Sequence, residues 1–217
     1  MPINRRIKSP ESSRGTLIIW VFHLTIKKNN KYRQMKRKIL LPTDFSMNAL
    51  QAIHYALELY KNEACIFYLL NVFSVDLKNI YNIANMVSGS EAYETEKTNS
   101  ENELEKLLNI FAFGEKGNPK HNFQTISIFN NPLEAIKNIV EEKDIELIVM
   151  GTRGETKARG HVFGSIAVSV MEKVRNCPVI VVPELAKIQL PKEIVFPTSY
   201  KTHFKKRELS YLIDIAQ

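Results

Sequence analysis

This 217-residue sequence is poor in cysteine. Its two cysteines, Cys65 and Cys177, lie near the starts of predicted strands. If those strands occupy positions two and five of a sheet, three spacings of about 4.8 Å separate them, too far for a disulfide. We therefore predict buried free thiols in a reducing compartment. Neither cysteine has a neighbouring His or acidic residue arranged to activate it as a nucleophile.

The sequence also lacks a long apolar run. The run Leu17–Leu24 is interrupted by His23 and is shorter than the roughly 20 residues of a membrane span. Basic residues follow it, where a secretory leader would have small residues for cleavage. We expect no transmembrane segment and a cytoplasmic location.

Familiar catalytic patterns are missing. No glycine loop closes with lysine followed by Ser or Thr, and the G-x-G-x-x-G fingerprint of dinucleotide enzymes is absent. There are no paired carboxylates and no metal-ligand cluster, and His54, His121 and His161 stand alone in the sequence. We predict no catalytic residue and no metal ligand.

The positive charge is concentrated at one end. The chain carries a formal net charge of +7, yet residues 1–38 alone hold eleven Lys and Arg against Glu11, a net +10. The remainder is mildly acidic, so the overall charge does not indicate a specific nucleic-acid-binding fold. We expect residues 1–34 to be a disordered basic extension from an upstream start, with a membrane-surface anchor as the alternative.

Strand-like and helix-like segments alternate through the middle of the chain. The predicted strands are Ile39–Leu41, Ala64–Val72, Phe123–Phe129, Ile145–Met150 and Val179–Val182. Most are continuous apolar runs, typical of strands covered on both faces. The pattern predicts an α/β fold with a doubly wound, Rossmann-like, five-stranded parallel sheet of order 3-2-1-4-5 and helices on both faces. Ligands then belong at the carboxyl ends of strands one and four.

A glycine-punctuated loop follows the fourth of these strands. Gly151 and Gly154 are two residues apart, nine more follow, and Gly164 and Ser165 then open a helix. The first N–H groups of a helix lack intrahelical partners and favour an anion. Glycine permits close approach of the backbone and positive φ, and Ser165 could cap the helix or bind a phosphate oxygen. Together with Arg153, these residues predict a phosphate site.

This glycine spacing resembles the ATP-binding signature of the universal stress protein family. The resemblance covers roughly residues 36–183 and implies ATP, with or without Mg²⁺, as cofactor. It also implies a homodimer, which we expect through the edge of the fifth strand. In the family, the turn after strand one lies beside adenine and ribose, which matches Asp44 here, although Asp44 could instead only stabilise a turn. The predicted binding residues are Pro42, Thr43, Asp44, Val72, Met150, Gly151, Arg153, Gly154, Gly164, Ser165 and Ile166.

A partial repeat lies near the end of the chain. Residues 193–200 match residues 38–45 at Pro197, Thr198 and Tyr200, and a helical pattern follows. We therefore expect a nucleotide-binding domain over residues 35–185. Residues 186–217 would form a linker and the first strand and helix of an incomplete second domain, as in a shortened tandem universal stress protein.

The function expected from the resemblance is that of a nucleotide-dependent regulatory or interaction module in stress response. One alternative is an enzyme of a related class, such as an ATP pyrophosphatase or adenylyl-transferring protein. Another is an interaction domain of the same fold without a ligand. The sequence leaves slow ATP hydrolysis open.

Overall fold

The structure is a computed structural model that describes the greater part of the chain. The described residues are 19–20, 36–74, 90–113, 117–152, 164–195, 213 and 215. The predicted site residues Arg153 and Gly154 lie outside them, as do most of residues 1–34 and 196–217.

The sheet contains the five parallel strands expected from the sequence. They are β2 (Arg37–Pro42), β3 (Cys65–Phe73), β4 (His121–Phe129), β5 (Leu147–Gly151) and β6 (Val179–Val182). Their spatial order is β6-β5-β2-β3-β4, which confirms the predicted order 3-2-1-4-5. Ile39 of the central strand β2 pairs with Phe67 on one side and Leu147 on the other.

A sixth strand, β1 (Ile19–Trp20), was not predicted. It pairs antiparallel with β6, placing Ile19 opposite Ile180 and Trp20 opposite Val179. The sequence analysis placed these two residues in a disordered extension. An edge strand offers unpaired backbone donors and acceptors, and β1 satisfies part of that edge. The described sheet therefore has five parallel strands and one short antiparallel strand.

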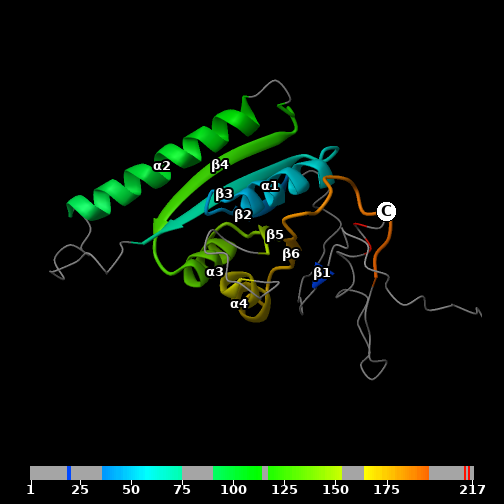
Figure 1. Cartoon of the computed structure of the whole chain (residues 1–217). Coiled ribbons are helices and arrows are strands. Elements are labelled where there is room, and N and C mark those ends of the chain that lie inside the picture. Colours follow the sequence, from blue (N-terminus) through cyan, green and yellow to red (C-terminus); the bar gives the residue numbers. More distant parts are fainter. Residues whose placement is uncertain are drawn as a thin grey trace, which may run out of the picture.

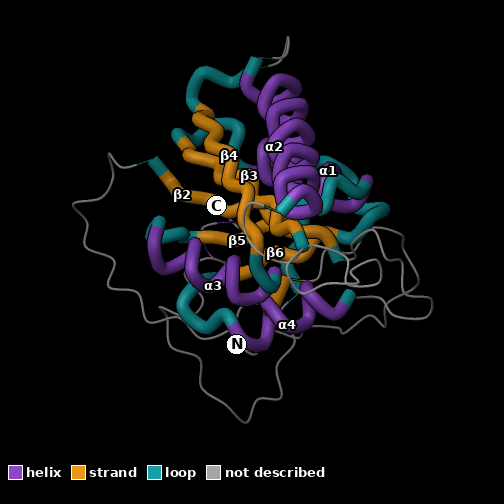
Figure 2. The backbone as a smooth tube through the Cα atoms, turned by 90° about the vertical axis from the view of Figure 1, so that its left-hand side faces the viewer, coloured by secondary structure: helices purple, strands orange, loops and turns teal. Residues whose placement is uncertain are grey.

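Helices cover both faces of the sheet, as predicted. They are α1 (Met47–Leu59), α2 (Glu91–Ala112), α3 (Pro132–Glu142) and α4 (Ser165–Lys173). Helices α1 and α2 lie on one face, and α3 and α4 lie on the other (Figures 1 and 2). The hydroxyl of Ser46 accepts a hydrogen bond from the N–H of Ala49, so Ser46 caps α1 as expected. In the described parts of the chain, no helix combines the length and the apolarity needed to cross a membrane.

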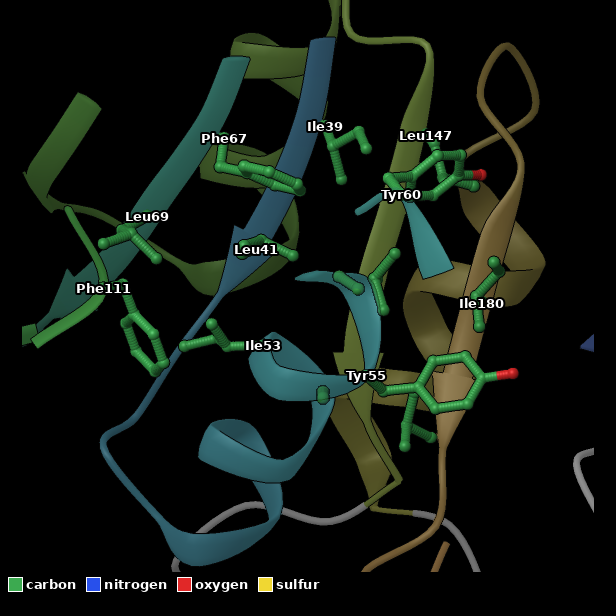
Figure 3. Packing of buried hydrophobic residues seen from close by; sticks show 14 of the residues in the cluster. Ile39, Leu41, Ile53, Tyr55, Tyr60, Phe67, Leu69, Phe111, Leu147 and Ile180 are labelled. Atoms are coloured by element: carbon green, nitrogen blue, oxygen red, sulfur yellow. The ribbon is translucent and has the colours of Figure 1, made fainter. Parts of the chain in front are cut away.

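Alternate residues of each strand point into two separate cores. Figure 3 shows the core beneath α1 and α2, where Leu41 of the sheet lies near Ile53 of α1 and Phe111 of α2. Leu40, Tyr68 and their neighbours on the opposite face pack against α3 and α4. Because strand side chains alternate with a period of two, these continuous apolar runs serve both cores.

The cysteines Cys65 and Cys177 are free and buried, which is the tested part of their prediction. Two strands, β2 and β5, separate β3 from β6. Burial raises the pKa of Cys65 to about 12 and also raises the pKa of Cys177, so both thiols are held in the protonated form.

The chain beyond β6 returns to the first core. Ala186 is buried there, the side-chain amide of Gln51 on α1 donates to its carbonyl, and Ile215 packs against the same core. Residues 193–195 form no strand, and the rest of the predicted second-domain strand lies outside the described residues. Ile213 and Ile215 are helical. The incomplete second domain stays a prediction.

Candidate ligand-binding site

A cavity of about 320 Å³ opens at the carboxyl ends of β2 and β5. Nine of the eleven predicted binding residues line it: Pro42, Thr43, Asp44, Val72, Met150, Gly151, Gly164, Ser165 and Ile166. The turn after β2 and the loop after β5 thus converge, as expected where the winding of a parallel sheet reverses. Their contact with a nucleotide stays a prediction.

Six further lining residues were missed: Ala49, Leu70, Pro132, Ile136, Thr152 and Ala167. Pro132 and Ile136 come from the first two turns of α3, whose start the sequence did place after a strand. Because every strand in the parallel part of the sheet ends at this edge, each following helix begins there too. That rule could have added α3 to the site.

The turn after β2 is fixed by short hydrogen bonds. The N–H of Thr43 donates to the carbonyl of Leu70 over 2.8 Å, and the hydroxyl of Thr43 accepts from the N–H of Phe45 over 3.0 Å. Asp44 accepts from the N–H of Ser46 over 3.2 Å. Phe45 has φ of 63°, a left-handed conformation that is costly for a bulky residue. Asp44 therefore does stabilise the turn, and it also lines the cavity.

A buried side-chain amide on β3 hydrogen-bonds to this turn. The side-chain amide of Asn71 on β3 donates to the carbonyl of Thr43 over 2.8 Å. From the sequence, Asn71 was expected with Val72 at the ligand edge, but its hydrogen bond to Thr43 was not, because the partner of a polar residue at the end of an apolar strand is unknown before the fold is.

The glycine loop begins at Thr152 and ends at Gly164, and these two residues, here called its neck, are hydrogen-bonded to each other. Thr152 receives a hydrogen bond on its carbonyl from the N–H of Gly164 over 2.7 Å, and its own N–H donates to the carbonyl of Val182 over 3.1 Å. Its hydroxyl donates to the side-chain oxygen of Asn48 on α1 over 3.1 Å. Thr152 is 3% exposed. The two ends of the loop are thus held together on the sheet edge.

Gly151 and Gly164, the two motif glycines among the described residues, do not adopt the positive φ considered in the sequence analysis. A Cβ added at Gly151 would lie 2.8 Å from Cγ of Asn48 and 3.0 Å from the Asn48 carbonyl oxygen. Gly151 therefore allows α1 to approach β5 closely. Gly164 has φ of −72° and ψ of 158°, a conformation open to any residue.

Among the described residues, no side chain caps the N-terminus of helix α4, which faces the cavity. Gly164 is its N-cap, without a side-chain hydrogen bond, and Ser165 is the first helical residue. Capping by Ser165, one of the two roles considered for it, is thus wrong. The N–H of Val168 makes the first intrahelical bond, to Gly164. The preceding N–H groups belong to residues that line the cavity, where they can bind an anion.

Comparison with known proteins agrees with this geometry. The sequence model of the universal stress protein family matches residues 35–183, more than half of the chain. The protein belongs to the universal stress protein family. Universal stress protein MJ0577 of Methanocaldococcus jannaschii is 28% identical over 158 residues, covering 68% of this chain and 95% of the relative. Universal stress protein MJ0531 of the same organism is 30% identical over 151 residues, covering 70% and 84%.

Solved structures give the same fold. The structure of hypothetical protein MJ0577 superposes with a TM-score of 0.55 at 28% identity, covering 69% of this chain and 96% of that chain. Universal stress protein UspA from Lactobacillus plantarum superposes with a TM-score of 0.56 at 21% identity, covering 69% and 99%, and shows the fold alone.

The cavity of this universal stress protein has two chemically different parts. The lining includes the apolar residues Leu70, Val72, Ile136 and Met150, called the apolar wall below, and the residues at the start of α4. Asp44 is the one charged side chain among the described lining residues. The described residues contain no group of three His, Cys, Asp or Glu placed to hold a metal. Such a cavity suits a ligand with a flat apolar ring and an anionic tail.

Proposed function

We propose that this universal stress protein binds ATP in the cavity between the turn after β2 and the start of α4, and acts as a nucleotide-dependent regulatory or interaction module. One observation carries the proposal: the N-terminus of α4, to which its N-cap Gly164 adds no side-chain cap, opens into a cavity whose described lining is otherwise mostly apolar. The helix N-terminus stabilises phosphate, and the apolar wall takes the adenine ring. Asp44, at the turn, is positioned to accept a hydrogen bond from the base or ribose.

Titration calorimetry with ATP, with and without Mg²⁺, tests this function. We expect a dissociation constant in the micromolar range, as charge-assisted hydrogen bonds to phosphate would give. Native mass spectrometry of the purified protein should show retained nucleotide. Phosphate release, followed in parallel, separates a binding module from an enzyme.

Substitution at Gly164 sharpens the test. Gly164→Asp keeps the helix start, because Asp is a favourable N-cap, but sets a carboxylate where the phosphates bind. Gly164→Asn is the matched neutral control of the same size. ATP affinity should fall by at least about a hundredfold in the Asp variant, roughly 2.7 kcal/mol, and much less in the Asn variant. Equal affinity of Gly164→Asp and the parent would remove this site from consideration.

We also propose a cytoplasmic location and a homodimer through β6. The buried free thiols support the location, which imaging of the tagged full chain would check. For the dimer, β1 already pairs with Val179 and Ile180, so a second copy must displace it or pair beyond it. Deleting residues 1–34 should then increase self-association, measured by light scattering. If the truncated chain is monomeric at the same concentrations as the full chain, a dimer through this edge is contradicted.

A further inference from the structure

Asn48 joins α1 to the ends of two strands. It is the second residue of the helix and is 5% exposed. Its side-chain amide donates to the carbonyl of Val182 over 3.0 Å, and its side-chain oxygen accepts from the hydroxyl of Thr152 over 3.1 Å. Burying an amide costs free energy unless such bonds are formed, so the position depends on both partners.

The absence of a side chain at Gly151 makes room for this contact. A Cβ at Gly151 would come within 2.9 Å of the Asn48 side-chain oxygen. Gly151 therefore lets Asn48 lie directly against the strand end, within reach of Thr152. The first glycine of the motif and the amide on α1 form a matched pair.

Thr152 transmits the contact to the start of α4. Its carbonyl accepts from the N–H of Gly164, the N-cap of that helix, over 2.7 Å. A side chain on α1 is thus two hydrogen bonds from the helix N-terminus that faces the cavity. Asn48 itself is absent from the lining of the cavity.

We propose that Asn48 is a positioning residue that fixes the neck of the glycine loop, and through it the aim of the α4 N-terminus at the ligand's phosphates. The proposal rests on the proposed nucleotide binding at this cavity. Without Asn48, the hydroxyl of Thr152 loses its acceptor, and the neck loses its tie to α1. The phosphate part of the affinity should then weaken while the ring part persists, because the apolar wall does not involve Asn48.

Binding of ATP and of adenosine to Asn48→Ala separates positioning from general stability. ATP affinity should fall about tenfold, and adenosine affinity should change less than about twofold. Gln51→Ala is the matched control: it removes an amide one turn along α1 whose bond goes to Ala186, away from the cavity. Both affinities should be unchanged in this control.

Thr152→Val tests the same hydrogen bond from its other partner, because it removes the hydroxyl at similar volume. Combined with Asn48→Ala, it should cost little more ATP affinity than either change alone, as expected for two partners of one bond. Full additivity of the two losses would overturn the proposal, as would equal losses for ATP and adenosine in Asn48→Ala.

Hydrogen exchange gives a readout that needs no ligand. The amide of Gly164 should exchange faster in Asn48→Ala, while the amide of Ile148, bonded to the carbonyl of Pro178, should not change. Unchanged exchange at Gly164 would overturn the positioning role. Failure of the parent protein to bind either ligand would overturn the proposed function and the nucleotide part of this inference together, whatever the exchange shows.

Discussion

The two ends of the parallel sheet close their loops with different kinds of side chain. At the amino ends of the strands, long charged side chains, a histidine and the half-buried amide of Asn118 reach across the surface. At the carboxyl ends, where the cavity lies, short buried amides and hydroxyls do the same task. The difference shows how a fold stabilises one end and leaves space at the other.

The amino end is held by side chains that remain partly in solvent. The ammonium of Lys38 donates to the carbonyl of Lys143 over 2.7 Å, and that of Lys120 donates to the carbonyl of Asn62 over 3.0 Å. Arg37 forms an ion pair with Glu63 at 3.1 Å. Such side chains keep their charge hydrated, so closing a loop with them costs little desolvation.

At the carboxyl end of the sheet, buried polar side chains make the corresponding hydrogen bonds. Asn48, Asn71 and Thr152 are buried there: Asn48 and the Thr152 hydroxyl bond to each other, and Asn71 bonds to the turn after β2. A long flexible side chain at these positions would occupy the space a ligand needs. Short amides fix the loops from behind and leave the cavity open, which places the binding function at this end.

Gly151→Ala should have the largest effect on stability. The added methyl group would lie 2.8 Å from Cγ of Asn48 and 3.0 Å from its backbone oxygen, so helix and strand must move apart. We expect the free energy of unfolding in urea to fall by about 2 kcal/mol, with weaker ATP binding. Gly164→Ala, at a backbone conformation open to any residue, is the control and should cost under about 1 kcal/mol. Equal losses in the two variants would break the link between Gly151 and the approach of α1.

Arg37→Met should weaken the amino end of the sheet without affecting ligand binding at the carboxyl end. It keeps the apolar stem but removes the ion pair with Glu63 and the guanidinium placed 5.2 Å from the centre of the Tyr60 ring. The free energy of unfolding should fall by about 1 kcal/mol, with ATP affinity unchanged in calorimetry. Lys106→Met, which breaks an exposed pair with Glu103 on α2, should cost less than about 0.5 kcal/mol. A drop in ATP affinity in Arg37→Met would show that the ends are coupled.

His121 should give the smallest effect, a pH dependence at the amino end. Burial lowers its pKa, while its hydrogen bond to the Tyr60 carbonyl acts in the opposite direction. The unfolded chain therefore takes up the proton first, and the free energy of unfolding decreases as pH falls below about 6.5, until the folded form is protonated as well. Burial lowers the pKa of His54 too, so the slope is shared.

Urea midpoints at pH 7.5 and 5.5 for the parent, His121→Gln and His54→Gln would check this contribution. Each variant should lose less stability on acidification than the parent does. The same loss in all three proteins would assign the acid sensitivity to other groups.

Much of the fold could be predicted because its signals are local. The apolar runs of β3 and β6 indicated buried strands, and the alternation with helices indicated a parallel sheet whose order the structure confirms. Strand β1 could not be found this way. Two residues carry no usable periodicity, and their pairing depends on an edge of β6 that exists only once the sheet has formed.

The candidate site, like the fold, was predicted from the sequence only in part. The turn at Pro42 and the glycines of the loop were predicted to meet, and those in the described residues do. Ser165 was considered as a cap for α4, because serine is the better N-cap by propensity, whereas the backbone conformation makes Gly164 the cap. Thr152 was passed over although it directly follows Gly151, since its hydroxyl had no visible partner.

By itself, the sequence determined the alternation of elements, the helices on both faces of the sheet and the convergence of two loops at one sheet edge. These follow from the spacing of apolar residues and from glycine, which act over a few positions. Tertiary structure alone decided which polar groups hold the site. Asn48 bonds to Thr152 and Val182 across 104 and 134 residues, and Asn71 bonds to Thr43 across 28. Hydrogen bonds require a specific distance and direction, and for residues so far apart only the folded chain supplies both.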